Sequence, residues 1–328
     1  MKYYDVTTEL VRKLGRANTA GQLRYNASGI RVAARAAELW VDVSARYVEH
    51  EPWLAVALNG AVIARFPVPD GRSRFCVYRN KSGETTNEVE VIRETQAMFG
   101  DCEVTVHGVE TDDAGELVPV RERELRLEVI GDSITSGEGA IGAATELDWI
   151  AAFFSAVNAY PRKLAAKLDA DVRVFSQSGF GVTRSWDGGT FGALPNFYDQ
   201  AVVFAEEKHD FGSWQPDAVI INLGTNDSGG GASGAGFKDG ALAFLRDVRR
   251  HNPSAHIVWA IGMLGSPYLA ELRETVAEFG DDDYTVLQLP EQTFETIGAR
   301  GHPGERCHEL AAEALARHLR AVLPKLKA

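Results

Sequence analysis

Cysteine is scarce in this sequence, and long apolar runs are absent. Cys76, Cys102 and Cys307 are odd in number, lie far apart and include no C-x-x-C pair. They therefore predict neither a disulfide framework nor a zinc site, and we expect free thiols that are buried or partly buried. The N-terminus lacks the apolar stretch of a signal peptide, and no segment approaches the length of a membrane span. These absences predict a cytoplasmic protein.

Basic residues are also in short supply. The chain of 328 residues has 34 Lys and Arg against 46 Asp and Glu, a formal net charge of -12. This charge argues against nucleic acid or an anionic membrane as the main partner, and it is compatible with a neutral substrate. No metal site is predicted either, because six of the histidines show no metal-ligand spacing: His50, His107, His209, His251, His256 and His318.

The first part of the chain has the pattern of an all-β domain. Short runs of alternating polarity are separated by turn-prone pieces, and the Asn59-Gly60 pair between two apolar runs is a strong hairpin signal. The candidate strands cover residues 30–34, 39–43, 53–58, 74–78, 88–92 and 102–108. Many short strands at this spacing predict an antiparallel sandwich of jelly-roll type over residues 1–123.

The pattern changes after Glu124 to strands that alternate with helices. Strands are expected over 125–130, 172–175, 217–223, 256–261 and 284–289. Helices are expected from Asn158, as the cap, to Leu168, and over 197–208, 237–250, 268–279 and 302–323, with a glycine-rich site loop at 229–236. This alternation predicts a parallel, doubly wound three-layer α/β/α domain of flavodoxin-like type over residues 124–328.

Residue types suited to acyl transfer follow the strands of this predicted sheet. Ser133 follows the first strand, Gly179 the second and Asn226 the third, and His302 lies between the fifth strand and the last helix. The carboxyl ends of parallel strands share one edge, where ligands bind. Ser133 is thus a candidate nucleophile and His302 its base. The Ser133 and Gly179 amides and the Asn226 side chain are candidate oxyanion donors, with Gly181 as the alternative to Gly179.

These residues carry a family resemblance. Gly131-Asp132-Ser133, Gly179, Gly224-Thr225-Asn226-Asp227 and His302 stand in the order of the four blocks of SGNH/GDSL hydrolases. The preceding β domain, with Gly301-His302-Pro303 and His308, resembles carbohydrate esterase family 2 in particular. The resemblance implies a jelly-roll domain joined to an SGNH domain. It also implies removal of acetyl groups from plant polysaccharides and their fragments, without a cofactor.

One position departs from the superfamily pattern. Most SGNH enzymes have an aspartate three residues before the histidine, whereas this chain has Ala299. Either a distant acid or a backbone carbonyl must then orient His302. The resemblance to family 2 favours the carbonyl, and with it a Ser-His dyad.

Several neighbouring residues have weaker functional signals. Trp186 follows the second block and is a candidate for stacking on a sugar ring, and Trp259, inside the fourth strand, is either a second such contact or part of the core. Asp132 and Asp227 flank the candidate catalytic positions, and we expect each to accept hydrogen bonds from loop backbone. His308 is expected to be structural.

Together these features predict a serine esterase that acts through an acetyl-Ser133 intermediate. The expected substrates are acetylated oligosaccharides such as manno- or xylo-oligosaccharides. The alternatives are a lipase or thioesterase with the same serine and histidine, and a non-catalytic carbohydrate-binding protein on a degenerate scaffold. The sequence does not predict the oligomeric state.

Overall fold

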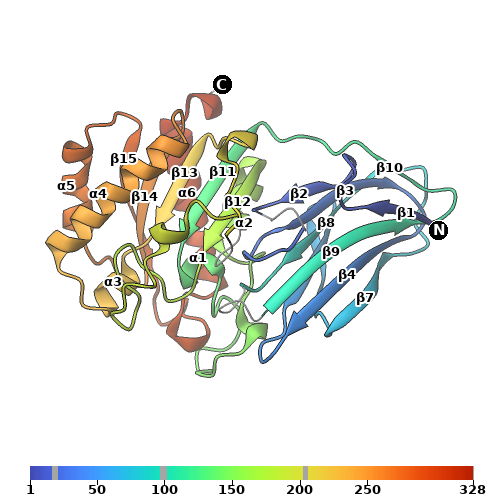
Figure 1. Ribbon diagram of the computed structural model, residues 1–328, viewed down its shortest axis with the longest axis horizontal. Coiled ribbons are helices and arrows are strands. Elements are labelled where there is room, and N and C mark those ends of the chain that lie inside the picture. Colours follow the sequence, from blue (N-terminus) through green and yellow to red (C-terminus); the bar gives the residue numbers. More distant parts are fainter. Residues whose placement is uncertain (17–20, 97–101, 202–205, 328) are drawn as a thin grey trace. The chain divides into compact units, whose positions relative to one another are not determined.

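The described residues of the protein, in a computed structural model, form two compact units (Figure 1). The structure describes residues 1–16, 21–96, 102–201 and 206–327. The first unit runs to Glu122 and includes 150–152 and the described residues of 201–207. The second unit comprises the rest of the chain from Arg123.

The first unit is built from two antiparallel sheets. In strand order, one contains β1 (Lys2–Asp5), β9 (Cys102–Thr111), β4 (Leu39–Tyr47) and β7 (Gly71–Tyr78). The other contains β10 (Glu116–Val118), β3 (Gly29–Arg35), β8 (Asn87–Arg93), β5 (Trp53–Leu58) and β6 (Ala61–Pro67), with β2 (Arg12–Leu14) paired to β3. Alternate side chains of both sheets, such as Val104 and Val32, enter one shared core. The all-β prediction is confirmed, and the jelly-roll connectivity stays a prediction.

The predicted hairpin at Asn59-Gly60 is confirmed. Leu58 of β5 pairs with Ala61 of β6, so the loop consists of these two residues alone. Their φ angles, 51° and 84°, both lie in the left-handed region, as a type I′ turn requires. Asparagine and glycine tolerate that region best, which is why this pair was a reliable signal.

The second unit contains a five-stranded sheet in which all pairs are parallel. In order, its strands are β12 (Ala170–Ser176), β11 (Leu125–Gly131), β13 (Ala218–Asn222), β14 (His256–Met263) and β15 (Tyr284–Glu291). This is the flavodoxin-like order, in which the winding direction reverses at the first strand. The apolar residues of β11, β13 and β14 are almost entirely buried, as expected for strands covered on both faces.

Four longer helices pack on this sheet in two pairs (Figure 1). Helix α2 (Tyr160–Leu168) packs against α6 (Glu305–Val322), and α4 (Gly234–His251) packs against α5 (Leu269–Phe279). Because strand–helix–strand crossovers are right-handed, reversal of the winding at β11 puts α2 on the face opposite α4 and α5. The predicted α/β/α architecture is therefore present in this unit.

Three local predictions are wrong. The N-cap of α2 is Ala159, without a side-chain cap bond, while the Asn158 side chain donates to Ser155 Oγ at 3.0 Å. The helix expected over 197–208 is not found among its described residues, which include a 3-10 turn ending at Phe197; residues 202–205 lie outside the described residues. Phe197 and Tyr198, at the start of this range, instead pack against other aromatic side chains. The expected loop at 229–236 is reduced to 230–233, because α4 begins at Gly234.

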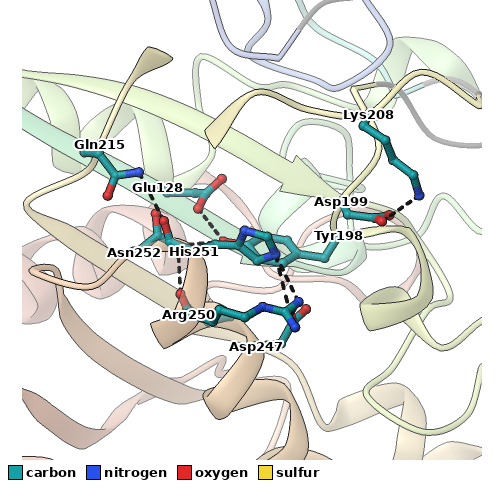
Figure 2. Close-up of polar contacts among 10 residues, drawn as sticks. Glu128, Tyr198, Asp199, Lys208, Gln215, Asp247, Arg250, His251 and Asn252 are labelled. Atoms are coloured by element: carbon teal, nitrogen blue, oxygen red, sulfur yellow. Dashed lines mark hydrogen bonds and ion pairs between the residues drawn. The ribbon is translucent and has the colours of Figure 1, made fainter. Parts of the chain in front are cut away.

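A charged residue in the middle of β11 is paired inside the unit (Figure 2). Glu128 is 3% exposed, and Tyr198 Oη donates to its carboxylate at 2.8 Å. Asn252 Nδ2, just after α4, in turn donates to Tyr198 Oη at 2.9 Å. Burial of a carboxylate is costly unless its oxygens accept hydrogen bonds. This network explains how β11 tolerates a glutamate in the sheet interior.

The substitution Tyr198→Phe is expected to lower the free energy of unfolding by about 1–3 kcal/mol, because it removes a hydrogen bond to a buried carboxylate and leaves Asn252 Nδ2 with only its bond to the Val248 carbonyl. Urea unfolding measures this loss. Tyr47→Phe is the control, since no partner of the Tyr47 hydroxyl is found among the described residues. Equal effects of the two substitutions would show that the network does not stabilise the fold.

Candidate active site

The candidate nucleophile occupies a tight turn at the end of β11. Ser133 is the first residue of the short helix α1 (Ser133–Ser136) and is 7% exposed. Asp132 caps this helix, and its Oδ1 accepts a hydrogen bond from the Ile134 amide at 3.0 Å. A Cβ atom on Gly131 would lie 1.9 Å from Thr135 Oγ1, so only glycine fits. The turn therefore has one tightly packed conformation, which sets the direction of the serine side chain.

The structure brings Ser133 and His302 into hydrogen-bonding distance. His302 Nε2 lies 3.0 Å from Ser133 Oγ, and His302 Nδ1 lies 3.1 Å from the Arg300 carbonyl oxygen. A carbonyl can only accept, so the partner chemistry assigns the ring proton to Nδ1. Nε2 then presents its lone pair to the serine hydroxyl, as a general base requires.

The acceptor for His302 Nδ1 is a backbone group of a residue that the sequence did not single out. Arg300 lies two positions before the histidine, and Ala299 beside it is fully buried. No carboxylate oxygen lies within 4.0 Å of the His302 ring nitrogens among the residues that the structure describes. Of the two possibilities that the sequence left open, a distant acid and a backbone carbonyl, the described geometry contains the carbonyl.

The Asn226 side chain reaches the same turn from α3 (Thr225–Gly229). Its Nδ2 donates to the Phe180 carbonyl at 2.8 Å and to Asp132 Oδ2 at 3.1 Å. Burial raises the pKa of Asp132 to about 7, although the bond from the Ile134 amide opposes this shift. A carboxyl that is partly protonated near neutrality competes less strongly for the Asn226 amide. The Asn226 amide thus lies at the turn that carries Ser133 and donates to Asp132. An oxyanion would have to displace Asp132 to accept this hydrogen bond.

The two candidate glycines of the second block differ in the state of their amides. The Gly181 amide donates to the Gly192 carbonyl at 3.0 Å and is therefore already used. For the Gly179 amide, no acceptor is found in the described part of the chain. Gly179 also has a φ of 81°, in the left-handed region that glycine adopts without strain. The geometry therefore favours Gly179 over Gly181 as the available donor.

A buried aspartate holds the loop that follows Gly179. Asp227 is fully buried and accepts from the amides of Val182 (2.8 Å), Thr183 (2.7 Å) and Arg184 (3.2 Å), and from Thr183 Oγ1 at 2.8 Å. The three amide bonds confirm that Asp227 accepts from loop backbone, as Asp132 does from Ile134. They anchor the segment between Gly179 and Trp186.

The two candidate tryptophans have opposite environments. Trp186 is 67% exposed, and its amide donates to the Gly179 carbonyl at 2.9 Å, so an open indole stands beside the candidate oxyanion donor. Trp259 is fully buried in β14 and its Nε1 donates to the Leu223 carbonyl at 3.1 Å. The prediction of a sugar contact at Trp259 is wrong, because the sheet is covered on both faces and Trp259 is part of its core.

His308 has the structural role expected of it. It is fully buried in α6, and its Nδ1 accepts from the Tyr160 amide at 3.2 Å. It thereby satisfies an amide in the first turn of α2, which Ala159 leaves without a side-chain cap. Burial lowers the pKa of His308 to about 3, and the nearby positive charge of Lys163 adds to this shift.

The described residues contain free cysteines, but no metal-binding cluster and no helix that could span a membrane. All three cysteines are free thiols, as expected, and Cys102 and Cys307 are buried. The expected burial is wrong for Cys76, which is exposed in β7. Within the described ranges, no group of three or more His, Cys, Asp or Glu side chains is arranged to hold a metal ion. No helix in the described structure has both the length and the apolar character needed to cross a bilayer.

A serine and a histidine in this order, at the carboxyl edge of a flavodoxin-like sheet, define an acyl hydrolase of the SGNH class. Residues 129–310, more than half of the chain, match the GDSL-like Lipase/Acylhydrolase family, and the match includes both Ser133 and His302. The protein therefore belongs to this family and is a carboxylic ester hydrolase of the GDSL/SGNH type.

The relatives of the chain extend the likeness to both units. The solved acetyl xylan esterase Est2A from the rumen bacterium Butyrivibrio proteoclasticus is 32% identical, with a TM-score of 0.91 over 98% of this chain and 99% of that one. An acetylxylan esterase / glucomannan deacetylase of Cellvibrio japonicus is 29% identical over 81% of this chain and 69% of its own length. The cellulase/esterase CelE of Acetivibrio thermocellus is 27% identical over 81% of this chain, but the match spans only 33% of CelE.

The pKa of His308 predicts acid sensitivity. The unfolded protein binds a proton at this residue below about pH 6.5, whereas the folded protein does so only near 3, so stability is lost as the pH falls between these values. We expect the unfolding free energy of the wild type to fall by about 2–3 kcal/mol more than that of His308→Asn between pH 6.5 and 4.5. Asparagine can still accept from the Tyr160 amide but does not titrate.

Denaturant unfolding at the two pH values measures the difference. His256 and His318, whose pKa values are also lowered by burial, are present in both proteins and cancel. Parallel pH dependences in the two proteins would contradict a buried neutral His308.

Proposed function

We propose that this protein is a serine esterase that removes O-acetyl groups from acetylated carbohydrate through an acetyl-Ser133 intermediate. The observation that carries the proposal is the His302 Nε2 to Ser133 Oγ distance of 3.0 Å, with Nδ1 facing the Arg300 carbonyl. The names of the relatives, acetylxylan esterase and glucomannan deacetylase, support acetylated plant carbohydrate as the substrate class.

In the acylation step, His302 Nε2 takes the proton of Ser133 Oγ as this oxygen attacks the acetyl carbonyl carbon. The Arg300 carbonyl holds the Nδ1 proton, so the imidazolium that forms keeps its orientation. When the tetrahedral intermediate collapses, the bond from carbon to the sugar oxygen breaks. The proton on Nε2 passes to that oxygen, and the sugar leaves as an alcohol.

The negative charge of the tetrahedral intermediate needs fixed donors. We assign this role to the amides of Ser133 and Gly179 and to Asn226 Nδ2. Asn226 Nδ2 would give up its hydrogen bond to Asp132 and donate to the oxyanion instead. Deacetylation of Ser133 repeats the cycle with water as the nucleophile, activated by His302. It releases acetate and restores the serine hydroxyl.

Trp186 is the proposed sugar contact. The residue is 67% exposed, and its amide donates to the carbonyl of Gly179, whose own amide is one of the proposed oxyanion donors. A flat apolar ring suits the CH-rich face of a pyranose, and it would seat the sugar next to the acetyl carbonyl. The proposed substrates are accordingly short acetylated oligosaccharides, including manno- and xylo-oligosaccharides.

Acetate release tests the proposal directly. Wild type is expected to release acetate from acetylated manno- and xylo-oligosaccharides, and Ser133→Ala is expected to lose at least about 10³-fold of this rate, since it lacks the nucleophile. In a parallel series of esters with lengthening acyl chains, the wild-type rate is expected to fall with chain length.

Each rival function has its own outcome. Rates that rise with acyl-chain length would indicate a lipase or thioesterase. Equal, negligible rates of wild type and Ser133→Ala on every ester, together with retained oligosaccharide binding, would indicate a non-catalytic carbohydrate-binding protein.

Replacement of the exposed indole separates binding from chemistry. Trp186→Ala is expected to raise KM for an acetylated oligosaccharide roughly 5- to 20-fold, because it loses one aromatic stacking contact of about 1–2 kcal/mol. Steady-state kinetics on the oligosaccharide and on a small acetate ester without a sugar measure the effect. The small ester is the control, and an equal loss on both substrates would place Trp186 in loop support instead of sugar binding.

A further inference from the structure

Arg300 adopts a backbone conformation that normally favours glycine. Its φ of 57° and ψ of 27° lie in the left-handed region, which costs a residue with a side chain about 1–2 kcal/mol. The same residue presents its carbonyl oxygen to His302 Nδ1 at 3.1 Å. The orientation of the candidate base therefore depends on a peptide group that must be held in place by its surroundings.

The segment that follows α1 supplies these contacts. The Arg300 amide donates to the Glu146 carbonyl at 2.7 Å, and the preceding Ala299 amide donates to the Gly139 carbonyl at 3.1 Å. The Arg300 side chain adds an ion pair, with Nε 3.0 Å from Glu138 Oε1. The amide hydrogen bonds and the ion pair thus hold both the backbone and the side chain of Arg300 in place.

Glu138 is tied to the nucleophile as well. Its amide donates to the Ser133 carbonyl at 3.0 Å, and its side chain is only 5% exposed. Burial of a carboxylate is costly without a counter-charge, and breaking a buried pair leaves that cost uncompensated. One short segment therefore links the turn that carries Ser133 with the turn that carries His302.

The charge of Glu138 also affects the chemistry. His302 becomes a cation each time it accepts the serine proton, and an unneutralised guanidinium on Arg300 would oppose that cation. The carboxylate of Glu138 cancels this charge, although it does not touch the imidazole itself. Its effect on the base passes through Arg300.

We propose that Glu138 and Arg300 form a positioning pair that takes the place of the aspartate absent at Ala299. The carboxylate fixes the Arg300 peptide, and the Arg300 carbonyl fixes the ring and tautomer of His302. The kinetic part of this inference rests on the proposed function, whereas the structural part does not.

Glu138→Gln keeps the shape of the side chain and removes its charge. We expect kcat for acetate release to fall roughly 10- to 100-fold, the loss that a small misplacement of a catalytic group produces, with KM changed less than about twofold. Glu138→Asp, which keeps the charge, is expected to recover part of the lost kcat.

Arg300→Gly is a second variant. It leaves Glu138 in place, so its result does not depend on whether the fold tolerates a buried glutamine. Glycine adopts the left-handed conformation without strain and retains the carbonyl, so this variant loses only the ion pair. If the two residues act as a unit, the double variant is no slower than the slower single variant. Additive losses in the double variant would contradict a shared role.

The tautomer of His302, read from its ring ¹⁵N chemical shifts in a Ser133→Ala background, is a measurement that does not need activity. We expect the Nδ1–H form alone when Glu138 is present, and a mixture with the Nε2–H form in Glu138→Gln. Glu274→Gln is the control, since it removes the charge of one of the two carboxylates that pair with Lys238 between α4 and α5, at 2.9 Å, away from His302.

The two measurements separate the two proposals. If wild type hydrolyses no ester, the proposed function fails, and the tautomer comparison still decides the positioning role. An unchanged tautomer in Glu138→Gln, or a kcat within twofold of wild type and of Glu274→Gln, would overturn the positioning pair.

Discussion

The parallel register of β11 with its two neighbours is the constraint on which the site depends. Gly131 at the end of β11 pairs with Ser176 of β12 on one side and with Asn222 of β13 on the other. All three strands therefore end at one level, and the loops that carry Ser133, Gly179 and Asn226 leave the sheet side by side. A shift of register would separate these groups by several ångströms. The hydrogen-bond ladder of the sheet is thus what places the candidate oxyanion donors around the serine.

Buried polar groups stabilise this arrangement both next to the site and farther from it in the second unit. Asp227 accepts four hydrogen bonds from the loop after Gly179, and His308 accepts the Tyr160 amide at the start of α2. Glu128, further down β11, is satisfied by Tyr198. Each of these groups would destabilise the fold if it were left unpaired, so each restricts the backbone around it to one conformation. The site is rigid because these hydrogen bonds continue from the site into the core of the second unit.

Support of the histidine by a carbonyl instead of a carboxylate changes what the neighbouring residues must do. A carboxylate at the position of Ala299 would bring its own negative charge, which favours the imidazolium. A carbonyl contributes only a dipole, and its direction is set by the φ and ψ of Arg300. Those angles are unfavourable for arginine, so the support has to come from neighbouring groups, here the Glu146 carbonyl and the Glu138 carboxylate. Several groups thus take the place of the single aspartate side chain that orients the histidine in most SGNH enzymes.

The sequence by itself determined the parts of this protein that depend on local pattern. Hydrophobic periodicity identified the strands of the parallel sheet, and the Asn59-Gly60 pair identified its hairpin, because these features depend on neighbouring residues in the chain. The order of the blocks containing Ser133 and His302 was sufficient to predict that they meet. The tertiary structure alone decided which group faces His302 Nδ1, that Trp259 is core, that the Gly181 amide is occupied and that Glu138 pairs with Arg300. These facts depend on contacts between residues far apart in the chain and on the backbone angles of single residues, and neither leaves a periodic trace in the sequence.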